Sequence, residues 1–168
     1  DVEADTVSVT WDFGDGETAS GDIVSHTWSD DGSYTLVVIA SDEDGAETIE
    51  MVTITINNIA PNLQISSSSI SGDEGDTFTF TATVSDVPAD PISVTWDFDD
   101  GQTGDGTAVT HTFTDQELYL VEATATDGDG GIVTKTLYID VANVVPELSG
   151  LQLPTSVKEG EQFTVSIT

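Results

Sequence analysis

The aspartates of two short loops are the residues best suited to chemistry in this sequence. One loop reads DGDGG at residues 127–131, and the other reads DEDGA at residues 42–46. Carboxylate oxygens on flexible loops are the ligands that Ca²⁺ prefers, at about six to eight oxygens per ion. The first loop is only half of an EF-hand pattern, because no glutamate stands at its twelfth position. Both loops are therefore candidate calcium ligands of a different kind.

Two histidines, His26 and His111, are the other candidates for chemistry. Each begins a His-Thr-aromatic triplet, and the chain has no cysteine and no repeated Ser-centred turn of the G-x-S-x-G type. A catalytic triad needs three converging groups, and only one is visible here. The sequence therefore predicts no catalytic residue and a chain that is not an enzyme.

The charge of the chain limits its partners. Its 32 acidic residues face only two basic ones, which gives a formal net charge of -30. Such a surface repels nucleic acid and suits high salt or bound divalent cations. No run of about 18 apolar residues could span a bilayer. We expect no nucleic-acid partner, no membrane span in this segment, and an extracellular or cell-surface location in which a saline or marine setting would suit the charge.

The sequence that must form the elements positioning these residues occurs twice in the chain. WDFGDG at residues 11–16 returns as WDFDDG at residues 96–101, and residues 1–83 align with residues 86–168 without a gap. Within each copy, apolar residues alternate with polar ones, as in half-buried strands. Asp-Gly pairs separate these runs and are typical of tight turns. The pattern predicts antiparallel strands packed as a sandwich, with the WDF block as a turn-forming corner.

These blocks carry a resemblance to a known family. WDFGDG, the His-Thr-aromatic triplet and a Gly-x-Tyr motif together resemble the polycystic kidney disease (PKD) domain over nearly the whole chain. The resemblance implies an all-β fold of tandem immunoglobulin-like (PKD-type) antiparallel β-sandwiches, and structural hydrogen-bonding roles for both histidines. The second copy departs from the pattern, because Asp99 replaces Gly14 and ELY at residues 117–119 replaces GSY at residues 32–34. We expect these changes to loosen the turns.

The resemblance also implies a division of the chain. Residues 60–145 correspond to a complete PKD-like domain, residues 1–59 to a unit that lacks its first two strands, and residues 146–168 to the first strands of a third unit. The chain begins at Asp1 without a basic and apolar leader, so we expect a piece of a larger protein.

In the topology that the resemblance implies, the two acidic loops of a unit lie beside its N-terminal linker. This predicts a calcium site between consecutive units. The candidate ligands are Asp86, Asp90, Asp127 and Asp129 with Asn57 and Asn58 in the second unit, and Asp1, Asp5, Asp42, Glu43 and Asp44 in the first; Glu74 or Asp76 could contribute at the opposite end. Solvated acidic turns without a metal are the alternative.

Two functions stay open at this point. The first is a non-catalytic structural module of an extracellular or cell-surface repeat protein, assembled head to tail into a stalk, layer or filament and stiffened by interdomain calcium. The second is a spacer or a binding and adhesion module of a secreted hydrolase, because PKD-like domains accompany such enzymes. Surface glycans are candidate partners, and the SSSS run at residues 66–69 could carry O-linked sugars.

The incomplete first unit predicts contacts between copies. Without two strands, apolar residues such as Trp11, Tyr34 and Ile54 would be exposed to water. Residues 146–168 carry the missing pair of strands, with Leu148, Val157, Phe163 and Val165 as apolar inserts. Two arrangements fit: strand donation between separate chains, or covalent continuation in a long repeat protein, which the usual covalent tandem arrangement of the family favours.

Overall fold

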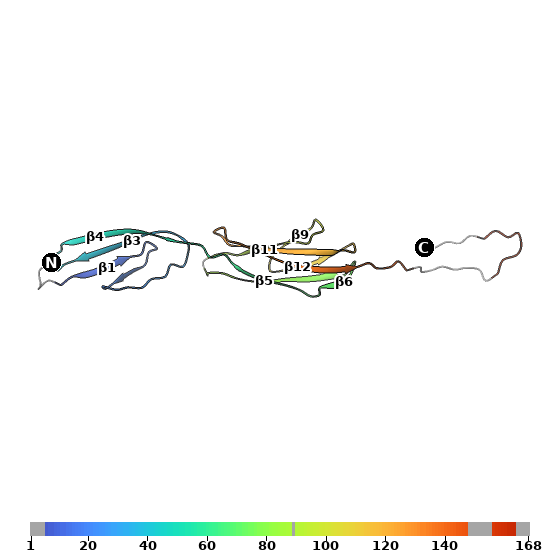
Figure 1. The fold of residues 1–168 in the computed structure, drawn as a ribbon, viewed down its shortest axis with the longest axis horizontal. Helices are drawn as coiled ribbons and strands as arrows, with labels where there is room; N and C mark the ends of the chain where they lie inside the picture. Colours follow the sequence, from blue (N-terminus) through green and yellow to red (C-terminus); the bar gives the residue numbers. More distant parts are fainter. Residues whose placement is uncertain (1–5, 89, 148–155, 164–168) are drawn as a thin grey trace.

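The computed structural model describes residues 6–88, 90–147 and 156–163, so that Asp1, Asp5, Leu148 and Val165 lie outside the described residues. Every regular element in these ranges is a β-strand, which confirms the all-β prediction. No helix among the described residues is long and apolar enough to cross a membrane. Figure 1 shows two units in a row, with residues 156–163 beyond the second unit.

The first unit is a single antiparallel sheet. Its strands are β1 (Ser8–Asp12), β2 (Thr18–Ser20), β3 (Gly32–Ser41) and β4 (Glu47–Ile56), in the order β2-β1-β3-β4. The register is set by pairs such as Trp11 with Val38 between β1 and β3, and Gly32 with Ile56 between β3 and β4. All strands in the described part of this unit belong to the one sheet, so one of its faces has no second sheet over it.

The second unit is a sandwich of two sheets. One sheet has the order β10-β7-β5 and the other the order β6-β12-β11-β8-β9. The strands are β5 (Asn62–Ser67), β6 (Ser71–Asp73), β7 (Thr77–Ser85), β8 (Ser93–Asp97), β9 (Thr103–Asp105), β10 (Ala108–Thr112), β11 (Leu118–Thr126) and β12 (Ile132–Ala142). All pairs are antiparallel except β6 with β12.

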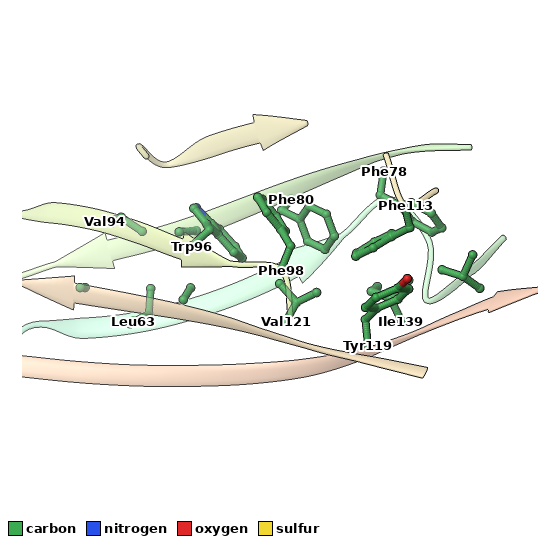
Figure 2. Close-up of a cluster of buried hydrophobic side chains, with 14 residues drawn as sticks. Leu63, Phe78, Phe80, Val94, Trp96, Phe98, Phe113, Tyr119, Val121 and Ile139 are labelled. Atoms are coloured by element: carbon green, nitrogen blue, oxygen red, sulfur yellow. The ribbon is translucent and has the colours of Figure 1, made fainter. Parts of the chain in front are cut away.

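The core of the second unit lies between these sheets. Alternation along β7, β8 and β11 buries every second side chain, as period two requires. Phe80 is completely buried, and its ring lies 5.6 Å from Trp96 and 5.3 Å from Phe98, centroid to centroid. Figure 2 shows this cluster of aromatic and aliphatic side chains. The strands β5 and β7 thus cover the inner face that the WDF block contributes.

The turns of the second copy are not loosened by their sequence changes. Asp99 has a φ of 65°, close to the 82° of Gly14, and its carboxylate accepts a hydrogen bond from the backbone N–H of Leu120 at 3.0 Å. Asp tolerates the left-handed region better than most residues. The hydroxyls of Tyr119 and Tyr34 each donate to a carbonyl four residues earlier, at 3.1 and 3.2 Å. The expectation of looser turns is therefore wrong.

The ends of the two units fall close to the expected divisions. The strands of the first unit end at Ile56, those of the second begin at Asn62, and β12 ends at Ala142. Residues 156–163, the part of the expected third unit that the structure describes, contain a turn and no strand. The domain boundaries at residues 59 and 145 stay predictions.

Candidate metal site at the junction of the two units

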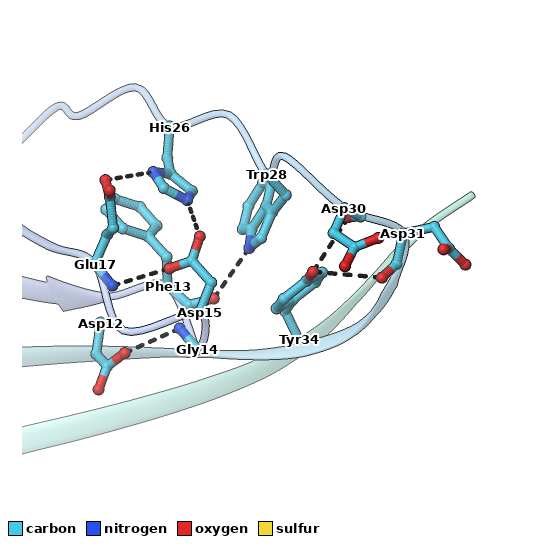
Figure 3. A network of polar contacts seen from close by, with 10 residues as sticks. All are labelled: Asp12, Phe13, Gly14, Asp15, Glu17, His26, Trp28, Asp30, Asp31 and Tyr34. Atoms are coloured by element: carbon cyan, nitrogen blue, oxygen red, sulfur yellow. Dashed lines mark hydrogen bonds and ion pairs between the residues drawn. The ribbon is translucent and has the colours of Figure 1, made fainter. Parts of the chain in front are cut away.

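The repeated WDF block builds the same polar network in both units. In the first unit, Nε2 of His26 lies 2.6 Å from the Asp15 carboxylate, and the imidazole stacks on Phe13 with 4.0 Å between ring centroids. Figure 3 shows this network. In the second unit, His111 lies 2.7 Å from the corresponding carboxylate and stacks at 4.0 Å on Phe98. The two histidine side chains are 9% and 7% exposed, and both tie a turn to the segment that follows it.

Hydrogen bonds also fix the carboxylate of this turn. The backbone N–H of Glu17 donates to Asp15 at 3.0 Å, and this bond, more than the contact with His26, lowers the pKa of Asp15. The Asp15 carboxylate thus connects the backbone of the turn to the His26 side chain and stabilises the turn. This arrangement matches a structural role for the histidines.

A different group of carboxylates meets where the two units join. One oxygen each from Asp86, Asp90 and Asp127 lies within 4.8 Å of the other two. Asp90 also forms a second group of this kind with Asp129 and Asp30. Asp30 belongs to the first unit, in the loop before β3, so the second group spans both units. We refer to these five aspartates together with Asn58 as the junction cluster.

Asp127 is held by its own loop and by the linker. Its Oδ1 accepts hydrogen bonds from the backbone N–H groups of Asp129 at 2.9 Å and Gly131 at 2.7 Å. Its Oδ2 accepts a hydrogen bond from the Asn58 side-chain amide at 2.9 Å. The bond from Asn58, followed by those from the loop, lowers the pKa of Asp127 although burial opposes it. The linker asparagine is thus attached directly to the acidic loop of the second unit.

Three oxygens of the junction cluster are buried without a hydrogen-bond partner. They are Oδ1 of Asn58, Oδ2 of Asp86 and Oδ1 of Asp90. A buried acceptor without a partner costs free energy, so each such atom in a folded protein needs an explanation. A cation bound in the cluster would be a partner for acceptors of this kind.

The repulsion between the carboxylates of the cluster also favours a bound cation. Burial, and then the charges of Asp129 and Asp86, raise the pKa of Asp90, which is 9% exposed. Burial and the neighbouring charges of Asp31 and Asp30 raise the pKa of Asp129. Like charges in a shared site disfavour ionisation, whereas a cation would favour it.

The donor set selects the kind of metal. The cluster offers carboxylate and amide oxygens and no imidazole or thiolate, which suits a hard cation. Ca²⁺ accepts a flexible shell of about six to eight oxygens, whereas Mg²⁺ requires a near-ideal octahedron and retains water. The donor set of the cluster therefore fits a hard cation such as calcium.

Most of the predicted ligands of the second unit come together, whereas in the first unit only Asp42, Glu43 and Asp44 fall within the described residues. Asp86, Asp90, Asp127, Asp129 and Asn58 all belong to the junction cluster. Asn57 is exposed and lines the small cavity at the junction, beside Asp31 and Val87.

The acidic loop of the first unit, residues 42–46, has the same backbone hydrogen bonds as the loop of residues 127–131 in the second unit. Oδ1 of Asp42 accepts from the backbone N–H of Asp44 at 3.0 Å and of Ala46 at 2.8 Å, as in the loop of Asp127. The Glu43 carboxylate instead accepts from the hydroxyl and backbone N–H of Thr6, and the hydroxyl bond in particular lowers its pKa. Within the described residues, none of these three acids belongs to a group of three metal-binding side chains.

Sequence reasoning missed two residues of the junction. One is Asp30, because only asparagines were expected from the preceding unit. The other is Gly131, where a Cβ would lie 2.9 Å from both Asn58 Nδ2 and Ala60 Cα. The first unit has Ala46 at the position of Gly131. This difference between two similar loops is the sequence feature that could have indicated a close contact at Gly131.

Comparisons with known proteins identify the kind of module. A family model described as PKD domain matches residues 1–56 and 58–141. Collagenase ColQ1 of Bacillus cereus (strain Q1) is 32% identical over 97 residues, and a microbial collagenase of Vibrio alginolyticus is 38% identical over 82 residues. Each match covers 48% of this chain but only 10% of the collagenase. The amphioxus IgVJ-C2 molecule, at 19% identity and a TM-score of 0.51, covers 83% of this chain with 91% of its own, which shows an immunoglobulin-like fold.

Proposed function

Because the chain belongs to the PKD domain family, we propose that it is a non-catalytic module of a secreted or cell-surface protein, in which β-sandwich units follow one another head to tail and calcium stiffens the junction between them. Family membership and the collagenase relatives support the coarser part, an accessory module of secreted proteins. Stalk, layer and filament are the forms that such an array would take.

The observation that carries the calcium part is the set of buried oxygens without partners. Asn58 comes from the linker, Asp86 and Asp90 from the loop after β7, and each has a buried oxygen without a partner. An ion that binds all three would restrict the linker relative to the second unit, and Asp30 would extend that restraint to the first unit. The effect on function would be mechanical, because a fixed angle at the junction makes the two units one rigid body.

A spacer in a secreted hydrolase is the second candidate. The two collagenase matches favour it, because each covers a small part of a much larger enzyme. A rigid calcium junction serves this role equally well, by holding another domain at a fixed distance. The native polypeptide distinguishes the two candidates. A repeat array would consist of further units of this kind, whereas a hydrolase would also contain a catalytic domain, and mass determination with peptide mapping tells them apart. Surface glycans and a saline setting stay expectations under either reading.

Calcium selectivity tests the proposal. Thermal unfolding of the full chain is measured with equal concentrations of Ca²⁺ or Mg²⁺ in about 0.15 M salt, where exposed charges more than about 8 Å apart are already largely screened. At a hundredfold excess over its dissociation constant, a specifically bound ion adds about 2.7 kcal/mol to the free energy of unfolding. We expect this increment for Ca²⁺ and not for Mg²⁺.

Two matched variants locate the effect. Asp90→Asn should remove the calcium-specific increment, whereas Asp105→Asn removes the same charge from an exposed position on β9 and should retain it. If both cations raise the melting temperature equally, or if Asp90→Asn keeps the calcium increment, the junction site is wrong and screening explains the effect.

A further inference from the structure

The five aspartates of the junction cluster form two separate groups. One is Asp86, Asp90 and Asp127, which we call the inner group; the other is Asp30, Asp90 and Asp129, which we call the outer group. In each group, one oxygen per side chain lies within 4.8 Å of the other two. The groups share only Asp90, and within the described residues the five aspartates do not form one larger group.

The size of each group matches a single calcium ion. Ca²⁺ lies about 2.3–2.6 Å from its oxygen ligands, so two oxygens on opposite sides of one ion are about 5 Å apart. Three oxygens within 4.8 Å of one another can therefore surround one ion. Five aspartates that fall into two groups of this size fit two ions better than one.

Asp90 is the residue that both groups need. It is 9% exposed, and its Oδ1 is buried without a hydrogen-bond partner. A carboxylate has two oxygens with about four lone-pair sites, so one side chain can serve two cations. Solvated acidic turns, the alternative for these loops, would leave this oxygen in contact with water. A buried oxygen without a partner therefore points to a bound ligand.

One ion leaves much of the charge of the cluster unbalanced. A single Ca²⁺ balances two of the five carboxylate charges, and a second ion balances two more. Like charges repel more strongly in a partly buried site than in water, because the effective dielectric constant is lower there. The carboxylate charge that remains after the first ion has bound therefore attracts a second cation.

The two groups differ in what they join. Asp86 and Asp127 follow β7 and β11 of the second unit, so an ion in the inner group is held by carboxylates of that unit alone. Asp30 precedes β3 of the first unit, whereas Asp129 lies between β11 and β12 of the second. Only an ion in the outer group is held by carboxylates of both units.

The inner group is preorganised for an ion, and the outer group is less so. Asp127 is 9% exposed, and its carboxylate accepts hydrogen bonds from Asn58 and from the backbone of its own loop. Asp30 and Asp129 are both exposed. Exposed side chains lose conformational freedom when they bind an ion, which lowers the affinity. The inner group should therefore fill at a lower calcium concentration than the outer group.

We propose that the junction binds two calcium ions that share Asp90: a tighter ion in the inner group, which stabilises the second unit, and a weaker ion in the outer group, which fixes the first unit to the second. The proposal deepens the calcium part of the proposed function and rests on it. Because only the weaker ion joins the units, the stiffness of the junction follows the calcium concentration over the range in which the outer group fills.

Titration calorimetry of the full chain counts the ions. We expect two calcium ions per chain, the second bound about tenfold more weakly than the first because its ligands must be ordered. Asp30→Asn should remove the weaker ion and keep the tighter one, whereas Asp86→Asn should weaken the tighter ion. Asp22→Asn is the matched control, since it removes a charge from an exposed position of the first unit outside both groups and should retain both ions.

The distance between the units shows which ion fixes the junction. The chain has no cysteine, so spin labels can be attached to single cysteines introduced in each unit. Ser20→Cys and Thr103→Cys use exposed positions of the first and second unit. Pulsed electron paramagnetic resonance measures the distribution of the label distance. It should stay broad when only the tighter ion is bound, narrow when the weaker ion binds, and stay broad throughout in Asp30→Asn.

The outcomes separate this proposal from the proposed function. One ion per chain, loss of both ions in Asp30→Asn, or a distribution that narrows fully in that variant would overturn the two-ion arrangement and leave a single junction ion in place. No bound calcium at all would overturn both proposals. Thermal unfolding in a chelator, which should be the same for Asp30→Asn and the original chain, shows that the variant is folded.

Discussion

Trp11 and Trp96 stand at the same position of two copies of one sequence, yet the second is 1% exposed and the first is only partly buried. Their local surroundings are nearly identical. Each indole N–H donates to a glycine carbonyl ten residues later, at 2.8 and 2.9 Å. What differs is the sheet of β5 and β7, which covers Trp96 only. The comparison teaches that hydrogen bonds between near neighbours form with or without a core, whereas burial needs the distant strands.

The largest effect should separate the two tryptophans. Trp96→Ala removes a fully buried ring and should lower the free energy of unfolding of the second unit by about 3–5 kcal/mol. Trp11→Ala should cost the first unit less than about half as much, because water already reaches that ring. Hydrogen exchange at β8 and β1 measures the two units separately. Equal losses would show that the first unit has a covered core in solution.

Substitution of the two histidines should lower the free energy of unfolding of their units by similar amounts, unlike substitution of the two tryptophans. His111→Ala and His26→Ala each remove a stacked ring and the partner of a carboxylate, and each should cost its unit about 1–3 kcal/mol. The two contacts have the same geometry, so the two losses should agree to within the error of the exchange measurement. A hydrolytic activity that disappears in either variant would contradict the structural role.

When no metal is bound, mild acid should stabilise the junction, whereas stronger acid should destabilise both units, because the lowered pKa of Asp127 acts in the same direction as those of Asp15 and Glu43. The raised pKa values of Asp90 and Asp129 mean that the folded junction binds protons more readily than the unfolded chain, so its stability increases as pH falls from neutral through those values toward 3.8. The lowered pKa values of Asp15 and Glu43 mean that the first unit loses stability as pH falls below 3.8 and 4.5, respectively.

Calorimetry between neutral pH and pH 4 checks this contrast. In chelator, the melting temperature of the second unit should rise by a few degrees at most on acidification, and Asp90→Asn should reduce the rise. The variant retains the general relief of net negative charge and so serves as its own control for that effect. A rise that is unchanged in Asp90→Asn would show that repulsion across the whole surface is responsible.

The smallest effect should be found at the turn where the copies differ in sequence. Asp99→Gly relieves the positive φ but loses the hydrogen bond to Leu120, and these opposing changes should leave the free energy of unfolding within about 1 kcal/mol of the original. Gly14→Ala should be worse, because its Cβ would lie 2.7 Å from the Thr35 carbonyl oxygen. Chemical denaturation resolves both, and a large loss for Asp99→Gly would show that the carboxylate is essential to the turn.

The sequence by itself determined the features that depend on near neighbours. Alternation around Trp96 and Tyr119 predicted strands, the Asp-Gly pairs predicted turns, and the spacing of the two copies predicted the repeat. The PKD resemblance supplied the topology, and with it the meeting of Asp90 with Asp127. These succeed because pleating and turn geometry act over a few residues, which the order of amino acids records directly.

Only the tertiary structure decided the details of the junction. Asp30 enters the cluster because the first unit ends against the second, and no local pattern marks it. The burial of the Asp90 oxygen without a partner depends on side chains from separate loops. Such positions are set by the sum of many distant contacts, which no short stretch of the sequence records.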